Sequence, residues 1–148
     1  MNTTKVLFLD FDGVLNSAEV FKVRGTADCI DRTMVLRVAR IVEETGCSVV
    51  ISSTWRLLHS MGQLKAMLRL NGLPDVVIDK TPSLWHNDGN RGDEIRTWLN
   101  ANPHVKQFVI LDDEADMGDC IDHLVRTSFK TGLQDEHVEQ AITILNKP

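Results

Sequence analysis

The sequence lacks the features that mark several special classes of protein. It has no basic excess, because 16 Lys and Arg against 21 Asp and Glu give a net charge of −5 at pH 7. That balance argues against binding nucleic acid over a broad electrostatic surface. No apolar run approaches the roughly 20 residues that a membrane helix needs, and we see no repeats, low-complexity tracts or linkers. We therefore expect one globular domain over residues 1–148, with no membrane contact.

Cysteine is also scarce. Cys29, Cys47 and Cys120 are odd in number and lack the spacing of a metal site. Cys47 stands beside an apolar run and is expected in the core. A reducing, cytoplasmic setting is the simplest expectation for such cysteine usage. The five histidines are scattered and offer no ligand pair at helical spacing.

The stretch Lys5–Val14 carries the strongest signal. Its apolar run Val6–Leu9 is typical of a strand buried on both faces, as in a parallel sheet. Asp10 and Asp12 follow one residue apart, so in an extended chain both can point to the same side as the strand ends. Gly13 relaxes the backbone there and allows a ligand to approach closely. This pattern indicates a site rather than a solvated acidic turn.

The rest of the chain alternates strands with helices. Further strands are predicted at 47–51, 76–78, 107–111 and 124–127, and helices at 31–45, 57–71, 91–102, 114–123 and 135–145. Alternation of this kind predicts an α/β fold, a three-layer Rossmann-like, doubly wound parallel sheet of about five strands. Residues 14–30 are expected to form a loop or small flap over the first strand, and loop 79–91 to lie near the site.

Polar residues follow three of the predicted strands. Asp10 ends the first, Ser52 the second, and Asp112 with Asp113 the fourth. In open α/β sheets, ligands bind outside the carboxyl ends of the strands, so these side chains are predicted to meet. Asp112 or Asp113 could instead only cap the helix that follows.

Together these segments resemble the haloacid dehalogenase (HAD) superfamily of phosphohydrolases. The resemblance rests on D-F-D-G-V, I-S-S-T-W-R, a basic residue opening a later helix, and V-I-L-D-D. In its S-S-T-W-R and R-G-D-E-I stretches the chain is most similar to the small HAD domain associated with RNA-repair proteins. The intervals 12–31 and 52–91 are too short for the cap domains found in that superfamily, so a small capless type with an open site is implied.

The resemblance also implies roles. Asp10 would be the nucleophile that forms an aspartyl-phosphate, and Asp12 the general acid and then the base. Ser52 would hydrogen-bond the phosphoryl oxygens, and Arg91 would supply the positive charge. Such charge is needed because a carboxylate and a phosphate repel each other.

A metal site is implied as well. Asp112, with Asp10 and the main-chain carbonyl of Asp12, would hold Mg2+, and Asp113 would assist directly or through water. Mg2+ prefers six hard oxygen ligands and keeps several waters, so this protein contribution is sufficient.

Several substrate-contacting positions stay open. Ser53 competes with Ser52 for the hydroxyl role, and Arg56 is a rival cation that could bind phosphate. Trp85 lies in a polar loop, where its ring could stack on a base or sugar or simply anchor the loop. Trp55, beside a helix start, is expected to pack beneath the site.

The predicted function is a Mg2+-dependent phosphomonoester hydrolase, acting on nucleotides or polynucleotide ends, as a monomer or homodimer. A dehalogenase would share the nucleophile, but dehalogenases of this superfamily lack the second Asp, so Asp12 argues against one. A receiver-like phosphoacceptor carries its aspartate on a later strand, whereas the D-x-D here ends the first. A catalytically inactive binding module is the remaining alternative.

Overall fold

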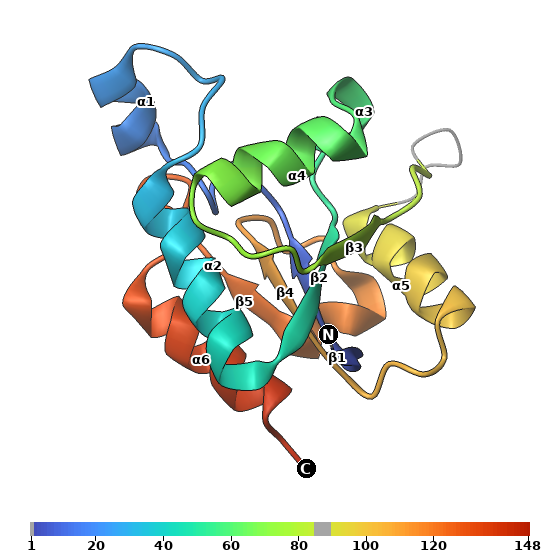
Figure 1. Cartoon of the computed structure of the whole chain (residues 1–148). Coiled ribbons are helices and arrows are strands. Elements are labelled where there is room, and N and C mark those ends of the chain that lie inside the picture. Colours follow the sequence, from blue (N-terminus) through green and yellow to red (C-terminus); the bar gives the residue numbers. More distant parts are fainter. Residues whose placement is uncertain (1, 85–89) are drawn as a thin grey trace.

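A five-stranded, all-parallel sheet forms the centre of the computed structural model, which describes residues 2–84 and 90–148 (Figure 1). The strands lie side by side in the order β3-β2-β1-β4-β5. Their bounds are β1 Asn2–Leu9, β2 Cys47–Ile51, β3 Val77–Lys80, β4 Gln107–Asp112 and β5 Leu124–Arg126. The central position of β1, with strands added outward on both sides, confirms the predicted doubly wound α/β fold.

Helices cover both faces of this sheet. On one face, Leu7 and Leu9 of β1 share a buried cluster with α2, α4 and α6. On the other, Val6 and Phe8 share a second cluster with α5 and the 3-10 helix η2. The bounds are α2 Arg32–Thr45, α4 Met61–Leu70, α5 Arg91–Ala101, η2 Gly118–His123 and α6 Asp135–Leu145. Both faces of β1 are therefore covered, as predicted from its unbroken apolar run.

Helix α2 begins and ends where the sequence predicts. The Asp31 side chain accepts a hydrogen bond from the Met34 amide, which satisfies one of the free N–H groups of the first turn. Gly46 ends the helix with φ +71°, in the left-handed region that glycine adopts readily. The predicted apolar positions between them are buried.

The helix predicted over residues 57–71 is wrong in its first part. The chain instead forms a short α3, Trp55–Leu58, and then α4. Ser60 and Gln63 form a capping box that starts α4 afresh. Leu57 and Leu58, predicted to face inward, are 53% and 81% exposed, because the break turns them away from the sheet.

Smaller differences concern element bounds. The segment predicted as a helix over 114–123 is helical only from Gly118, as the 3-10 helix η2. Strand β3 lies slightly later than predicted, and β4 extends to include Asp112. The predicted flap 14–30 contains a helix, α1 (Ala18–Arg24). Between β1 and α2 the described residues hold no other element, and no cap domain is present among them. Nor does any helix in the described part of the chain combine the length and apolarity needed to cross a membrane.

Candidate active site

The carboxyl ends of the three central strands are level with one another. Leu9 pairs with Ile51 of β2 and with Leu111 of β4. The next residue on each strand continues this register: the Asp10 amide donates to Leu111 O at 3.1 Å, and the Ser52 amide donates to Leu9 O at 3.0 Å. Asp10, Ser52 and Asp112 are thus adjacent at one edge of the sheet, as predicted from parallel strands.

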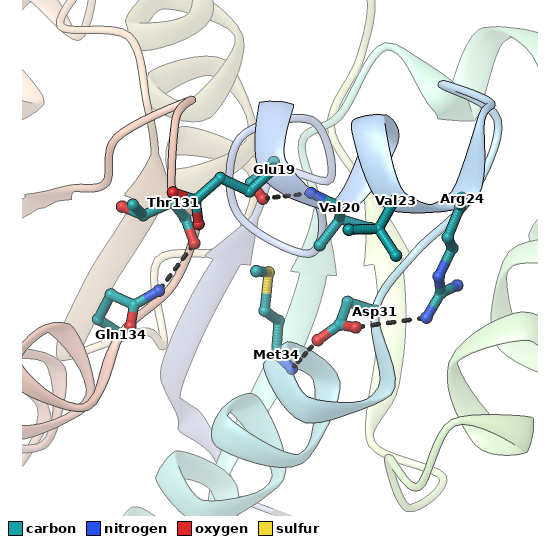
Figure 2. Close-up of a pocket in the computed structure, with 9 residues that line it drawn as sticks. Glu19, Val20, Val23, Arg24, Asp31, Met34, Thr131 and Gln134 are labelled. Atoms are coloured by element: carbon teal, nitrogen blue, oxygen red, sulfur yellow. Dashed lines mark hydrogen bonds and ion pairs between the residues drawn. The ribbon is translucent and has the colours of Figure 1, made fainter.

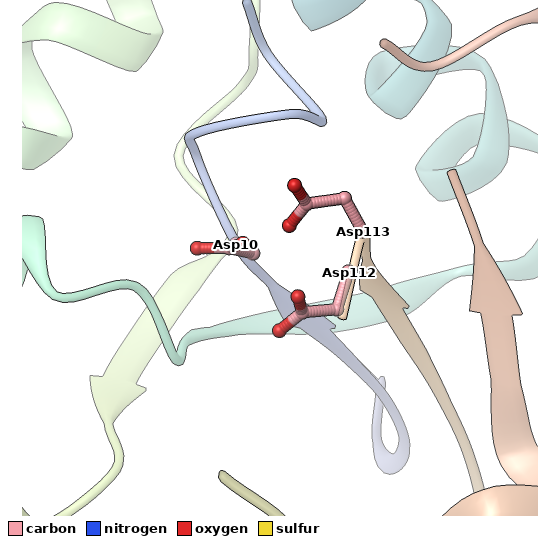
Figure 3. Close-up of side chains that lie close together, drawn as sticks. All are labelled: Asp10, Asp112 and Asp113. Atoms are coloured by element: carbon pink, nitrogen blue, oxygen red, sulfur yellow. The ribbon is translucent and has the colours of Figure 1, made fainter. Parts of the chain in front are cut away.

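Three carboxylates meet at this edge. Ligand atoms of Asp10, Asp112 and Asp113 all lie within 4.8 Å of one another, and Figure 3 shows them converging from the ends of β1 and β4. Asp10 and Asp112 are buried. The Asp12 carboxylate, predicted as the general acid and base, is outside this cluster of side chains. It accepts a hydrogen bond from Asn16 Nδ2 at 2.9 Å. The metal role predicted for Asp12 concerns its main-chain carbonyl and stays a prediction.

Arg91 lies beside two of the carboxylates. Strand alternation places Asp10 and Asp112 on the face covered by α5, because they continue the rows of Phe8 and Ile110. Arg91 opens α5 on that same face. Its Nη1 lies 3.3 Å from Asp10 Oδ1 and 3.3 Å from Asp112 Oδ2. The fold therefore places a positive charge beside Asp10 from a residue 81 positions away in the sequence.

The N-terminus of α5 is held close to the loop after β4. The Gly92 amide donates to Asp116 O at 3.0 Å. A Cβ at Gly92 would lie 2.1 Å from Met117 O, a distance that no side chain can occupy. The glycine next to Arg91 is therefore required for α5 to approach the acidic residues.

Burial and the negative charge of neighbouring aspartates raise the pKa of all three carboxyls. Burial raises the pKa of Asp10 to about 6, although Arg91 opposes the rise. Burial and the neighbouring Asp10 charge raise the pKa of Asp112 to about 7. The pKa of Asp113 rises to about 6, through burial and the Asp112 charge. One guanidinium therefore does not neutralise the cluster, and a further cation would stabilise the ionised forms.

The cluster fits a divalent cation that prefers oxygen. All of its side-chain donors are carboxylates, the ligands that Mg2+ takes in proteins. Asp112 Oδ2 is buried and accepts no hydrogen bond among the described residues, although Arg91 Nη1 lies 3.3 Å from it. A buried carboxylate oxygen without a hydrogen bond is costly unless a cation occupies its free lone pair.

Gly13 fixes the turn after Asp12. It adopts φ +79°, and a Cβ there would lie 2.5 Å from Asp113 Cγ. Its amide donates to Asn16 Oδ1 at 2.9 Å, and its carbonyl accepts from Thr127 Oγ1 at 2.6 Å. Neither Asn16 nor Thr127 was identified from the sequence as part of the site. The position of Thr127 directly after β5 was the available signal, since residues that follow parallel strands gather at this edge.

The two candidate serines differ in their surroundings. Ser52 Oγ is buried and has no hydrogen-bond partner among the described residues. Ser53 Oγ accepts from the Trp55 amide at 3.1 Å and so belongs to the local turn. Trp55 is buried and packs against Phe11, with ring centroids 5.2 Å apart, in agreement with its expected packing role. Ser52 therefore has the hydroxyl that is free to meet a ligand.

Arg56, predicted as a possible phosphate ligand, has protein partners for all of its guanidinium nitrogens. Nη2 donates to Glu94 Oε2 at 2.9 Å and to Pro82 O at 3.1 Å. Nη1 donates to Ser52 O and Ser53 O, and Nε donates to a third main-chain carbonyl, at 2.8–3.2 Å. Glu94, which also lines the cavity beside Arg91, was not identified from the sequence. Its place three residues after Arg91, on the same helical face, was the available signal. Trp85 lies outside the described residues.

Two of the cavities lined by described residues lie near this region. One, of about 540 Å³, is lined by Arg91 and Glu94 of α5, by Thr54, Arg56 and Leu57, and by Ser83. The other, of about 380 Å³, lies between α1 and the start of α2 (Figure 2), where Arg24 forms an ion pair with Asp31. Only the first is lined by a residue that contacts Asp10, so we take it as the cavity of the site.

Comparison with known families agrees with this geometry. The sequence model of a family described as "HAD domain in Swiss Army Knife RNA repair proteins" matches residues 6–138. That match includes every strand end described above. A comparison with curated proteins found no match.

Proposed function

Because this chain belongs to the family of HAD domains found in Swiss Army Knife RNA repair proteins, we propose that it is a Mg2+-dependent phosphomonoesterase. The observation that carries the proposal is the meeting of Asp10, Asp112 and Asp113 within 4.8 Å, with Arg91 3.3 Å from the first two. This arrangement suits attack of a carboxylate on a phosphate ester. A buried carboxylate lies beside a cation, with two further carboxylates and an open cavity next to it.

Asp10 is the proposed nucleophile. One of its carboxylate oxygens forms a bond to phosphorus while the bond from phosphorus to the ester oxygen breaks. Asp12 donates a proton to the leaving oxygen. In the second step Asp12 takes a proton from water, the water oxygen attacks phosphorus, and the bond to Asp10 breaks to release phosphate. The hydrogen bond from Asn16 Nδ2 to Asp12 Oδ1 orients this group for both transfers.

The phosphoryl oxygens need positive charge and donors. Arg91 supplies the charge, and the Ser52 hydroxyl, which has no described protein partner, supplies a hydrogen bond. Asp10, Asp112 and Asp113 would hold Mg2+ together with the Asp12 carbonyl; the ion would reduce the repulsion between the nucleophile and the substrate. These donors act on charge that spreads over the oxygens as the phosphoryl group is transferred.

The substrate class follows the family description. We propose a nucleotide or a phosphorylated polynucleotide end, since the matched family occurs in RNA repair proteins. With no cap domain among the described residues, the edge of the sheet can admit a large substrate. The net charge of −5 is compatible with this, because one chain end requires only local capture of its phosphate.

The test is a phosphatase screen with Mg2+ over 3′- and 5′-phosphorylated oligonucleotides, nucleotides, sugar phosphates and phosphopeptides. Asp10→Asn should abolish release of phosphate while retaining the fold, and Asp122→Asn, a matched change on an exposed surface, should not affect it. An Asp10→Asn variant with more than a few per cent of the wild-type rate would remove Asp10 as nucleophile. If the protein takes a phosphoryl group from acetyl phosphate and retains it without turnover, the receiver-like alternative would be favoured. Inactivity on every substrate would favour the binding-module alternative.

A further inference from the structure

Glu94 lies at the junction of three segments around the site cavity. It is buried in the first turn of α5, with 8% of its surface exposed. Its Oε2 accepts from Arg56 Nη2 at 2.9 Å and from the Leu84 amide at 3.0 Å. Its Oε1 lies 4.0 Å from Arg91 Nε. One carboxylate thus contacts the segment after β2, the segment after β3, and the cation of the site.

Arg56 extends this connection to the main chain. Besides Glu94, it donates to the carbonyls of Ser52 and Ser53 on one side and of Thr81 and Pro82 on the other. Its side chain is only 2% exposed. A guanidinium can serve this many acceptors because its donors form a planar fork. The ends of β2 and β3 are therefore bound to each other, and through Glu94 to α5.

The charge of Glu94 also acts on Arg91. The guanidinium of Arg91 lies between two sets of carboxylates: Asp10 and Asp112 at 3.3 Å, and Glu94 at 4.0 Å. Without Glu94, the described carboxylates that remain within 4.0 Å of the guanidinium, Asp10 and Asp112, would both lie on the side of the acidic cluster. The guanidinium would then be held by carboxylates through Nη1 alone, and its Nε would lose the carboxylate that lies 4.0 Å away.

We propose that Glu94 is a positioning residue that sets the place of Arg91 and, through Arg56, of the cavity walls at residues 52–56 and 81–84. The inference rests on the proposed function in one respect, the assignment of Arg91 to the phosphoryl group. It also revises the predicted role of Arg56. This residue acts on substrate binding indirectly, by holding the cavity walls in place, and not by direct contact.

The test replaces Glu94 by Gln, which keeps an acceptor for Arg56 and Leu84 but removes the charge. Hydrogen exchange measured by NMR at Arg91 Nε–Hε and at the Leu84 amide should become at least about tenfold faster. Exchange at the core amides of Leu9 and Leu111 should stay unchanged, whereas a purely structural loss of stability would accelerate these as well. Unchanged exchange at Arg91 Nε–Hε would overturn the inference.

The matched control is Glu139→Gln, which removes the same charge from a helical Glu paired with Arg40 on the exposed surface of α6. It should leave both signals unchanged. If Glu94→Gln does not fold, Glu94→Asp, which keeps the charge on a shorter side chain, should shift the same signals, and failure to do so would count against the inference.

Binding of inorganic phosphate with Mg2+, measured by calorimetry, completes the test. Glu94→Gln should bind phosphate at least about tenfold more weakly than the wild type, and Glu139→Gln equally well. Equal affinity in Glu94→Gln would overturn the positioning role. A wild type that binds no phosphate, while exchange at Arg91 still responds to Glu94, would refute the proposed function and leave the positioning role standing.

Discussion

The acidic cluster makes the stability of the protein depend on pH in an unusual direction. Most paired carboxylates have a lowered pKa and stabilise a fold as the pH rises. Here burial and the Asp10 charge raise the pKa of Asp112 from 3.8 to about 7. The folded protein therefore holds this proton more tightly than the unfolded chain does. Stability is greatest below the unfolded pKa and is lost as the pH rises through about 7.

The magnitude follows from these two values. Between about pH 5 and pH 7, ionising Asp112 costs the metal-free fold about 2 kcal/mol. For a domain of this size, that corresponds to a fall in Tm of about 4 to 8 °C. The raised pKa values of Asp10 and Asp113 act in the same direction. Mg2+ should reverse the trend, because it binds the ionised carboxylates and stabilises only the folded state.

The assay is thermal unfolding with EDTA and with millimolar Mg2+, at steps from about pH 5 to pH 7.5. Asp112→Asn should flatten the slope of the metal-free protein and lose most of the Mg2+ response. Asp122→Asn, exposed and outside the cluster, should behave as the wild type. A metal-free wild-type Tm that does not fall over this range, or an Asp112→Asn variant that keeps the wild-type slope, would refute the reasoning.

Three further variants test the supports of the site. Gly13→Ala should lower the free energy of unfolding by more than about 1 kcal/mol and weaken the Mg2+ response, since φ is +79° and the new Cβ would meet Asp113; a wild-type response would contradict this. Gly92→Ala should cost more, about 3 kcal/mol or above in a urea titration, because Met117 O lies where the Cβ must go. Thr127→Val should cost about 1 to 3 kcal/mol by leaving a buried carbonyl unsatisfied, and a loss below about 0.5 kcal/mol would show that the bond to Gly13 O is dispensable.

The sheet and its acidic edge were predictable because they depend on local pattern. The apolar run Val6–Leu9 predicts a buried strand without knowledge of the rest of the fold. When parallel strands end at the same level, the residues that follow them lie close together. Asp10, Ser52 and Asp112 followed from those two facts. The place of Arg91 required one more step, the packing of α5 on the same face of the sheet, and it came from the family resemblance rather than from periodicity.

The helix predicted over residues 57–71 was wrong because a local signal was overlooked, and the partners of Arg56 could not be predicted from the sequence. The Ser60–Gln63 capping box was legible in the sequence as the start of a new helix, yet apolar spacing favoured one continuous helix through Leu57 and Leu58. Arg56 was predicted as a rival cation that could bind phosphate; in the fold it is buried, and its guanidinium donors find their acceptors within the protein. Its acceptors lie after β2, after β3 and on α5, three segments that are brought together only in the folded protein.

The order of the strands determines whether Asp10, the proposed nucleophile, keeps its position when the fold opens locally. Asp10 continues the strand that is hydrogen-bonded on both sides, to β2 and to β4. Such a strand separates from its neighbours only when the whole molecule unfolds, whereas β3 and β5 at the margins can detach at lower cost. Local opening of β3 and β5 should therefore change which molecules can enter the site, while the Asp10 carboxylate keeps its position.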